Sequence, residues 1–525
     1  MPVSMIWPLT RKTFGLRQAR TVNKVQLPCP ATGRRTMNPV ISVMQKGFAC
    51  YRKALVVMLI SLSLVACSSS KDPELALIYS PAAKHQAPDR NPIIIIPGIL
   101  GSKLVDRQSG TVLWGAFDVK FANPNNPDDL RLLALPIPTD GDQLPVEKGQ
   151  IEPDGVLDRI KFRILGIPVQ LQAYANILST LGAGGYRDES LGLMGQIDYG
   201  SNHFTCFQFD YDWRLDNAAN AKRLHEFIVK KRVEIQRQHK EIYGIENSDV
   251  KFDIAAHSMG ALLTRYFLRY GSQELTEEAP PELTWEGAKY VERVIIIAPP
   301  NAGSIEALDH LINGQHIGRP VLPFYPAALL GTYPSLYQLM PRNRHQRVFW
   351  NQDTSRPVAD IYDPDLWQKM HWGLGSPEQD DILATLMPDV DDPLLRLAYA
   401  RRLQSRLLKR ATLFHAALDR PGNPPESLEL FLVSGDAEPT PATLTIESKT
   451  GKVKILSKEP GDGVVLRQSS LLDERTGGEW QPRLRSPLKF EQVLFLPNDH
   501  LGLTKSKTFR DNVLYWLLEK PRLSR

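Results

Sequence analysis

Short apolar runs recur along the chain and are separated by polar or amphipathic stretches. Residues 91–98 contain four consecutive isoleucines followed by a Pro-Gly turn, which is typical of a strand buried on both faces of a parallel sheet. Further apolar runs occupy residues 203–209, 250–256, 291–298, 428–434 and 492–496. Because helical periodicity lies between several of these runs, the pattern predicts an α/β fold with a mostly parallel central sheet flanked by helices.

The clearest helical pattern follows Asp216. From Leu224 onward, apolar residues recur at helical spacing among Lys, Arg and Glu, and Gly244 offers a C-terminal stop. An Arg-rich helix is expected over residues 394–418 and a C-terminal helix over residues 504–518. We expect the first of the three to cover a face of the sheet.

The alternation of strands and helices is interrupted twice. Residues 105–170 are rich in Pro, Asp and Gly, and they predict an irregular insertion. Residues 303–425 combine Pro-rich apolar stretches with the Arg-rich helix, and they predict an inserted cap. The core is therefore expected to occupy residues 91–302 and 426–520, after an extended Pro-containing tether at residues 67–90.

Residues 1–66 have the pattern of an upstream extension and a signal peptide. Lys46, Arg52 and Lys53 precede an apolar run at residues 54–64, which is shorter than the roughly 20 residues that a spanning helix needs. The run ends in Leu-Val-Ala-Cys67, which resembles the lipobox of bacterial lipoproteins, in which the cysteine carries the lipid. A plain secretory peptide with an accidental cysteine is the alternative.

The residue after Cys67 bears on localisation. Ser68 resembles an outer-membrane sorting signal of bacterial lipoproteins, so we expect a lipid-anchored protein of the bacterial cell envelope, in the outer membrane. After removal of Cys29 and Cys50 with the leader and lipidation of Cys67, Cys206 alone remains, and no intramolecular disulfide is possible.

The charge of the chain argues against nucleic acid as a partner. Its formal net charge of +5 is misleading, because residues 1–66 hold ten Lys or Arg and no acidic residue. The rest of the chain is therefore net acidic.

Residues 251–263 combine a strand, a tight turn and the start of a helix, the context of a nucleophile elbow. Ser258 lies at the tip of the turn. Strand and helix approach closely there, so the residues two before and two after the serine must be small, and Ala256 and Gly260 satisfy this. The pattern predicts that Ser258 is a nucleophile.

A serine nucleophile needs a histidine base and a carboxylate that orients it. In an α/β-hydrolase fold these follow in the order acid, then histidine. His500 is the last histidine and lies between an apolar run and the C-terminal helix, where the base belongs. Asp436, after the run at residues 428–434, and Asp462, between two glycines, are equally suitable acids on spacing alone.

The oxyanion that forms on attack needs two backbone N–H donors, one after the serine and one in the loop after an earlier strand. Met259 and Ile99 occupy these positions, and glycines near Ile99 let the backbone turn sharply. We find no metal-binding cluster, phosphate loop or dinucleotide fingerprint, and we expect no cofactor.

Five blocks follow one another along the chain, at residues 91–104, 210–215, 256–260, 298–304 and 461–465. In order and approximate spacing they resemble the lecithin:cholesterol acyltransferase family, which includes lysosomal phospholipase and phospholipid:diacylglycerol acyltransferase. The resemblance implies an α/β-hydrolase fold, a lipid or phospholipid substrate, and Asp462 as the acid of the triad, with Asp436 as fallback. It also supports Ser258, His500 and Ile99.

The expected activity is that of a serine-dependent acyl hydrolase or acyltransferase on lipid esters, by way of an acyl-enzyme on Ser258. A catalytically silent, lipid-anchored scaffold with the same fold is the alternative, because a fold does not fix a function. The Asp-Trp-Arg of residues 212–214 is expected to form a structural ion pair rather than to act in catalysis.

Overall fold

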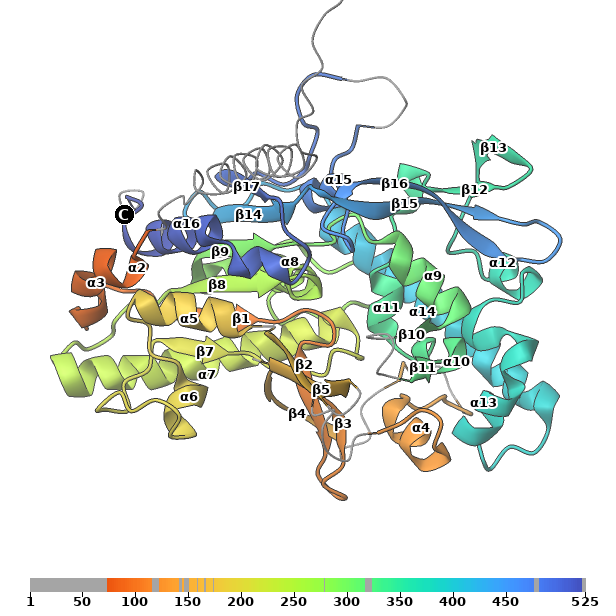
Figure 1. Cartoon of the computed structure of the whole chain (residues 1–525), viewed down its shortest axis with the longest axis horizontal. Helices are drawn as coiled ribbons and strands as arrows, with labels where there is room; N and C mark the ends of the chain where they lie inside the picture. The colour runs from red at the N-terminus through yellow and green to blue at the C-terminus, as the bar shows by residue number, and fades with distance from the viewer. Residues whose placement is uncertain are drawn as a thin grey trace, which may run out of the picture. The chain divides into compact units, whose positions relative to one another are not determined.

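A six-stranded parallel sheet lies at the centre of the molecule (Figure 1). The computed structural model describes residues 73–115, 122–140, 144–145, 151–157, 159–164, 167–172, 174–277, 279–316, 323–475 and 481–521. Every neighbouring pair in the sheet is parallel, and the order is β17-β14-β9-β8-β1-β7. All six strands fall on predicted apolar runs: β1 (Ile93–Ile96), β7 (Cys206–Gln208), β8 (Phe252–His257), β9 (Val291–Ile297), β14 (Glu429–Gly435) and β17 (Gln492–Leu496).

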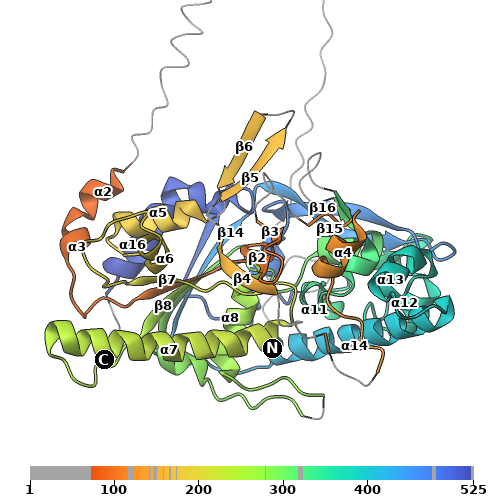
Figure 2. The same cartoon turned by 90° about the horizontal axis from the view of Figure 1, so that it is seen from below.

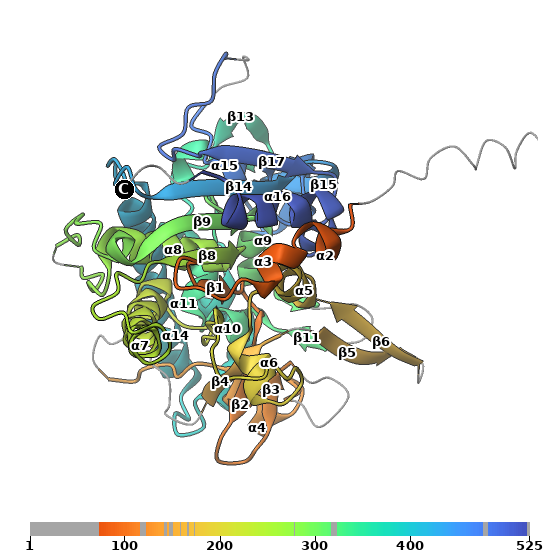
Figure 3. The same cartoon turned by 90° about the vertical axis from the view of Figure 1, so that its left-hand side faces the viewer.

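Both faces of this sheet are covered by helices (Figure 3). Ile94 and Ile96 belong to the core on one face, with α7 (Asn217–Tyr243) and α8 (Met259–Tyr270). Ile93 and Ile95 belong to the core on the other face, with α5 (Ala175–Ala183) and α16 (Lys507–Leu518). The strands are therefore apolar at every position, because alternate side chains point to opposite buried faces. The predicted α/β-hydrolase architecture is confirmed.

The predicted helices form with small shifts at their ends. The side chain of Asp216 caps α7 by accepting from the Ala219 N–H at 3.1 Å, and Gly244 ends the helix in a left-handed conformation. The Arg-rich helix is α14 (Pro393–Asp419), and Figure 2 shows it end to end with α7, where Arg410 donates to Asp216. Within the described residues, no helix is both long and apolar enough to cross a bilayer.

Residues 303–316 and 323–425 form a mainly helical region beside the carboxyl end of the sheet (Figure 1). A short strand in it, β12 (Val348–Trp350), pairs in parallel with β15 (Glu438–Ile446) of the core. The latter forms a hairpin with β16 (Val453–Gly461), which the sequence pattern did not predict. Between β9 and α14, this region contains the α-helices α9 (Ile305–Asn313), α10 (Ala327–Leu330), α11 (Pro334–Gln338), α12 (Pro364–Lys369) and α13 (Asp380–Leu386).

The insertion predicted as irregular is in part a small antiparallel sheet. Trp114 lies in it, buried, and donates from its indole to the Leu100 carbonyl at 2.7 Å, which ties the insertion to the core. The prediction of irregular structure was wrong, because strands from distant positions pair in this sheet: β2 (Ser102–Asp106), β3 (Val112–Trp114) and β4 (Ile151–Val156). A separate hairpin consists of β5 (Arg159–Ile164) and β6 (Ile167–Gln172), and α4 (Pro127–Leu133) lies between β3 and β4.

The segment predicted to be an extended tether is folded over much of its length. It contains α2 (Leu75–Ile78) and α3 (Ser80–Lys84). Tyr79 between them is buried, and Arg90 donates to the Gly184 carbonyl at 3.1 Å. The prediction was wrong here because these contacts attach the segment to the core. Cys67 lies outside the described residues.

Candidate active site

The carboxyl end of β8 forms a strained turn at Ser258. Its φ of 53° and ψ of −125° are unusual for a residue with a side chain, and such strain costs on the order of 1–3 kcal/mol. A Cβ on Gly260 would lie 2.3 Å from the Pro97 carbonyl oxygen, so only glycine fits there. The turn therefore has the geometry of the predicted elbow, with Ser258 buried at its tip and α8 beginning at Met259.

The loop after β1 lies against the nucleophile. A Cβ on Gly98 would be 2.7 Å from the Ser258 Cβ, which shows how closely the loop approaches. Within the described part of the chain, neither the Ile99 N–H nor the Met259 N–H donates a hydrogen bond. Met259 is also the first residue of α8, where the helix dipole favours negative charge. Both donors are therefore available to an oxyanion at this end of the sheet.

Asp462 and His500 form a hydrogen-bonded pair. The His500 Nδ1 lies 2.8 Å from the Asp462 Oδ2, and the His500 N–H donates to the Asp462 carbonyl at 2.9 Å. With Nδ1 donating to a carboxylate, the Nε2 of His500 is left as the basic nitrogen. The Ser258 hydroxyl makes no hydrogen bond to His500 among these described residues, and such contacts often tighten only when substrate binds.

The environment of Asp462 keeps its carboxylate charged. Burial raises its pKa, but His500 and the N–H groups of Val464 and Val465, at 3.0 and 2.7 Å from Oδ1, lower it, and the net shift is downward. A charged acceptor holds the His500 ring in one tautomer and stabilises the imidazolium that forms on proton transfer.

The alternative acid, Asp436, has a different partner. Its carboxylate faces Arg467 at 4.0 Å and is about one-third exposed. Asp462 reaches the end of β14 only because the β15–β16 hairpin returns the chain there. A Cβ on Gly435 would be 2.6 Å from the Asp462 Cβ, so Gly435 leaves room for it. The structure therefore brings Asp462, and not Asp436, to His500.

Two buried side chains behind the nucleophile were not predicted. The Tyr174 hydroxyl lies 2.8 Å from the Gly98 nitrogen and 3.0 Å from the His257 Nδ1, and the His257 Nε2 lies 3.1 Å from the His500 carbonyl oxygen. Burial and the nearby His500 lower the pKa of His257 to about 3, so this ring is neutral. Tyr174 carries no sequence signal, because it follows the predicted insertion at residues 105–170 and lies 83 residues from His257 in the chain.

Glu306, in the first turn of α9, is a further unpredicted residue near the pair. Burial raises its pKa to about 7, against the opposing effect of His500. The helix start is attached to the acid loop, since the Ser304 hydroxyl donates to the Val464 carbonyl at 3.0 Å. The signal for this residue was weak, because an acidic residue after a serine cap is common at helix starts.

The Asp-Trp-Arg block is structural, as predicted. Asp212 and Arg214 are buried and form an ion pair at 2.6 Å. Arg214 also donates to the carbonyls of Leu132 and Leu133, which attaches the end of α4 to the core. The Asp-Trp-Arg block therefore joins the insertion to the sheet.

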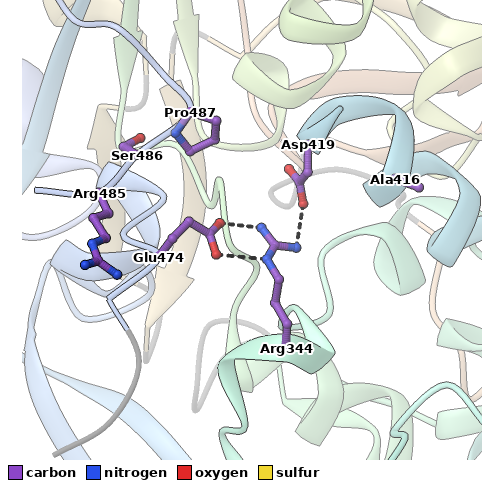
Figure 4. Close-up of a pocket in the computed structure, with 7 residues that line it drawn as sticks. All are labelled: Arg344, Ala416, Asp419, Glu474, Arg485, Ser486 and Pro487. Atoms are coloured by element: carbon purple, nitrogen blue, oxygen red, sulfur yellow. Dashed lines mark hydrogen bonds and ion pairs between the residues drawn. The ribbon is translucent and has the colours of Figure 1, made fainter. Parts of the chain in front are cut away.

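A surface pocket lined by Arg344, Asp419 and Glu474 contains a cluster of ion pairs (Figure 4). Asp419, at the end of α14, accepts from Arg342 at 2.7 Å and from Arg344 at 2.9 Å, and Arg265 lies 3.9 Å away. Arg344 also pairs with Glu474. Burial raises the pKa of Asp419, but the arginines, Arg342 above all, lower it well below its usual range. The cluster joins α14 to the segments before β12 and after α15 (Arg467–Leu471).

We expect Asp419→Asn to destabilise the fold by about 3 kcal/mol, because it leaves buried arginines without their carboxylate. Chemical denaturation at pH 7 measures this. Since the folded pKa is depressed, the contribution is complete above the unfolded pKa of about 4 and is lost as the pH falls through the folded pKa. Glu277→Gln, which removes the exposed pair with Lys409, is the control and should cost less than about 1 kcal/mol. Equal effects would contradict this account.

Comparison with known proteins identifies one family segment. The model of the family described as "Lecithin:cholesterol acyltransferase" matches residues 183–374, which include Ser258 but neither Asp462 nor His500. Comparison with curated protein sequences gives no match.

Solved structures give weaker similarities. The Tle4-Tli4 complex is 16% identical over 81% of this chain and 97% of that chain, with a TM-score of 0.46. Phospholipase PlaB from Legionella pneumophila is 14% identical over 64% and 56%, with a TM-score of 0.28. Lipase 1 from Pelosinus fermentans is 12% identical over 82% and 99%, with a TM-score of 0.29. At such values the fold assignment depends on the strand order and the elbow.

Proposed function

We propose that this chain, whose residues 183–374 match the lecithin:cholesterol acyltransferase family, is a lipid ester hydrolase or acyltransferase that works through an acyl-enzyme on Ser258. The proposed substrate is a phospholipid or a related lipid ester. The single observation that carries the mechanism is the 2.8 Å bond between Asp462 and His500 beside the strained Ser258 turn.

Acylation uses all of these groups. The Ser258 oxygen attacks the ester carbonyl carbon, and the His500 Nε2 takes the hydroxyl proton. The carbonyl oxygen becomes an oxyanion that accepts from the Ile99 and Met259 N–H groups. As the bond to the leaving alcohol breaks, His500 returns the proton to that alcohol, and Asp462 stabilises the imidazolium in between.

Deacylation repeats these steps with another hydroxyl compound. Water or an acceptor alcohol gives its proton to His500 and attacks the acyl carbon, and Ser258 leaves as a free serine. Water yields a fatty acid, and an alcohol yields a new ester. The same residues serve both outcomes, so the choice depends on whether the acyl-enzyme meets water or acceptor first.

The alternative of a catalytically silent scaffold is disfavoured, because the site lowers the stability of the fold. The strained backbone of Ser258 opposes folding, and a protein with no need for it gains stability by losing it. The site of this chain keeps this strained serine, together with two available N–H donors.

We further propose that Cys67 carries a lipid and anchors the protein in the bacterial outer membrane. The support is the Leu-Val-Ala-Cys sequence after a short apolar run. Metabolic labelling with a radioactive fatty acid in a bacterial host tests this: label should enter the wild type and not Cys67→Ser. Equal label in both would contradict the proposal.

The proposed function is tested with vesicles of phosphatidylcholine labelled in its acyl chains, with and without a long-chain alcohol. A lipase releases labelled fatty acid, and a transferase forms a labelled ester with the alcohol. A fluorophosphonate should stop either reaction and add its mass to the peptide that contains Ser258. Full activity after complete modification of Ser258 would refute the acyl-enzyme mechanism.

A further inference from the structure

A continuous chain of hydrogen bonds passes behind the proposed active site. It runs from the Gly98 N–H to the Tyr174 hydroxyl at 2.8 Å, and from that hydroxyl to the His257 Nδ1 at 3.0 Å. The His257 Nε2 then contacts the His500 carbonyl oxygen at 3.1 Å. Tyr174 and His257 are both buried, so water does not compete for these contacts.

The direction of every bond in this chain is determined. The His500 carbonyl can only accept, so the single proton of the neutral His257 ring is on Nε2 and donates to that carbonyl. Nδ1 is then an acceptor and takes the proton of the Tyr174 hydroxyl, whose oxygen accepts from the Gly98 N–H. Burial and His500 lower the pKa of His257 to about 3, which preserves this neutral form at ordinary pH.

These bonds connect the three loops that the proposed mechanism uses. Gly98 precedes the oxyanion donor Ile99, His257 precedes the nucleophile, and His500 is the base. Each comes from the end of a different strand, β1, β8 or β17, and Tyr174 comes from a fourth segment, just before α5. We propose that Tyr174 and His257 are positioning residues that hold the oxyanion loop and the histidine loop in register about Ser258, an inference that rests on the proposed function.

The chain of hydrogen bonds fixes the backbone of His500. Its N–H donates to the Asp462 carbonyl at 2.9 Å, and its carbonyl accepts from His257, so the main chain is held on both sides of the catalytic ring. The Gly98 N–H has no partner other than Tyr174 within the described residues. Because a misplacement of 1 Å can cost on the order of a hundredfold in rate, even small shifts of either loop lower kcat.

Tyr174→Phe tests the first link, with p-nitrophenyl butyrate as a soluble probe. We expect kcat to fall about tenfold while KM changes by less than about twofold, since the probe still binds but meets a displaced oxyanion loop. The matched control is Tyr270→Phe. That hydroxyl is equally buried and donates to the Ala417 carbonyl at 2.8 Å, but it lies at the far end of α8, about 18 Å from Ser258.

Two variants of His257 separate the links. The amide of His257→Asn reaches the position of Nδ1 and retains an acceptor for Tyr174, whereas that of His257→Gln reaches the position of Nε2 and retains a donor for the His500 carbonyl. We expect each to keep more activity than His257→Ala, which loses both links. If Tyr174→Phe fails to fold, the relative activities of the three His257 variants test the positioning role instead.

The result that overturns the inference is a Tyr174→Phe enzyme with wild-type kcat, or His257 variants that all lose activity equally and in proportion to their thermal stability. Ser258→Ala, measured beside them, distinguishes this outcome from failure of the proposed function. An active Ser258→Ala enzyme refutes the triad itself, whereas an inactive one with a fully active Tyr174→Phe refutes only the positioning role.

Discussion

Replacing Ser258 with alanine is expected to lower kcat for phospholipid or p-nitrophenyl ester by a factor on the order of 10⁵, because no other group can form the acyl-enzyme. Alanine also fits the space that Ser258 occupies between Gly98 and α8, so the fold should remain intact. The measurement is initial rate over a range of substrate concentrations, together with the thermal melting of both proteins. The variant should still bind lipid.

Ser470→Ala is the matched control for this prediction. Ser470 is also buried, and its hydroxyl makes no hydrogen bond within the part of the chain that the structure describes, so its removal should change neither the rate nor the stability by much. A Ser258→Ala enzyme that retains more than about a tenth of wild-type kcat would mean that the nucleophile is elsewhere.

Asp462→Asn is expected to lower kcat by about 10³- to 10⁴-fold, with the protein folded. The asparagine oxygen can still accept from the Val464 and Val465 N–H groups, so its amide NH₂ faces His500. That NH₂ donates to Nδ1 and forces the ring proton onto Nε2, the nitrogen that must accept the Ser258 proton. The base is then in the wrong tautomer. Steady-state kinetics at several pH values measure the loss.

Asp436→Asn is the control, because the two aspartates were equally suitable on spacing alone. Asp436 faces Arg467 and is partly exposed, so its substitution should leave kcat within about twofold of wild type. A large loss in Asp436→Asn beside an active Asp462→Asn would reverse the assignment of the acid.

The sheet was predictable because burial on both faces leaves a direct trace in the sequence. Four isoleucines in a row can only be accommodated where both sides of a strand are covered, as in β1. The elbow was predictable for a similar reason, since close packing at Gly260 excludes any side chain. Helix α7 was predictable from its two caps, Asp216 and Gly244.

Other features depend on contacts between distant residues and leave no local pattern. The choice of Asp462 over Asp436 depends on the β15–β16 hairpin, which carries prolines at 439 and 441 that weaken the signal for a strand. Tyr174 is significant only through its contacts with Gly98 and His257, far away in the chain. Short helices such as α2 and α3 form because Tyr79 and Arg90 pack on the core, which local sequence does not encode.

Because α2 and α3 are attached to the core, the linker between the proposed lipid anchor and the folded domain is short. With lipid on Cys67, as proposed, only the peptide units from Cys67 to Pro73 separate the anchor from folded protein, and they span at most about 20 Å. Leu77 and Ile78 on α2 are exposed close to this point. The short linker would hold an anchored molecule close to the bilayer surface while still allowing it to rotate. Its substrates would then be the lipids of the same membrane, next to the anchor.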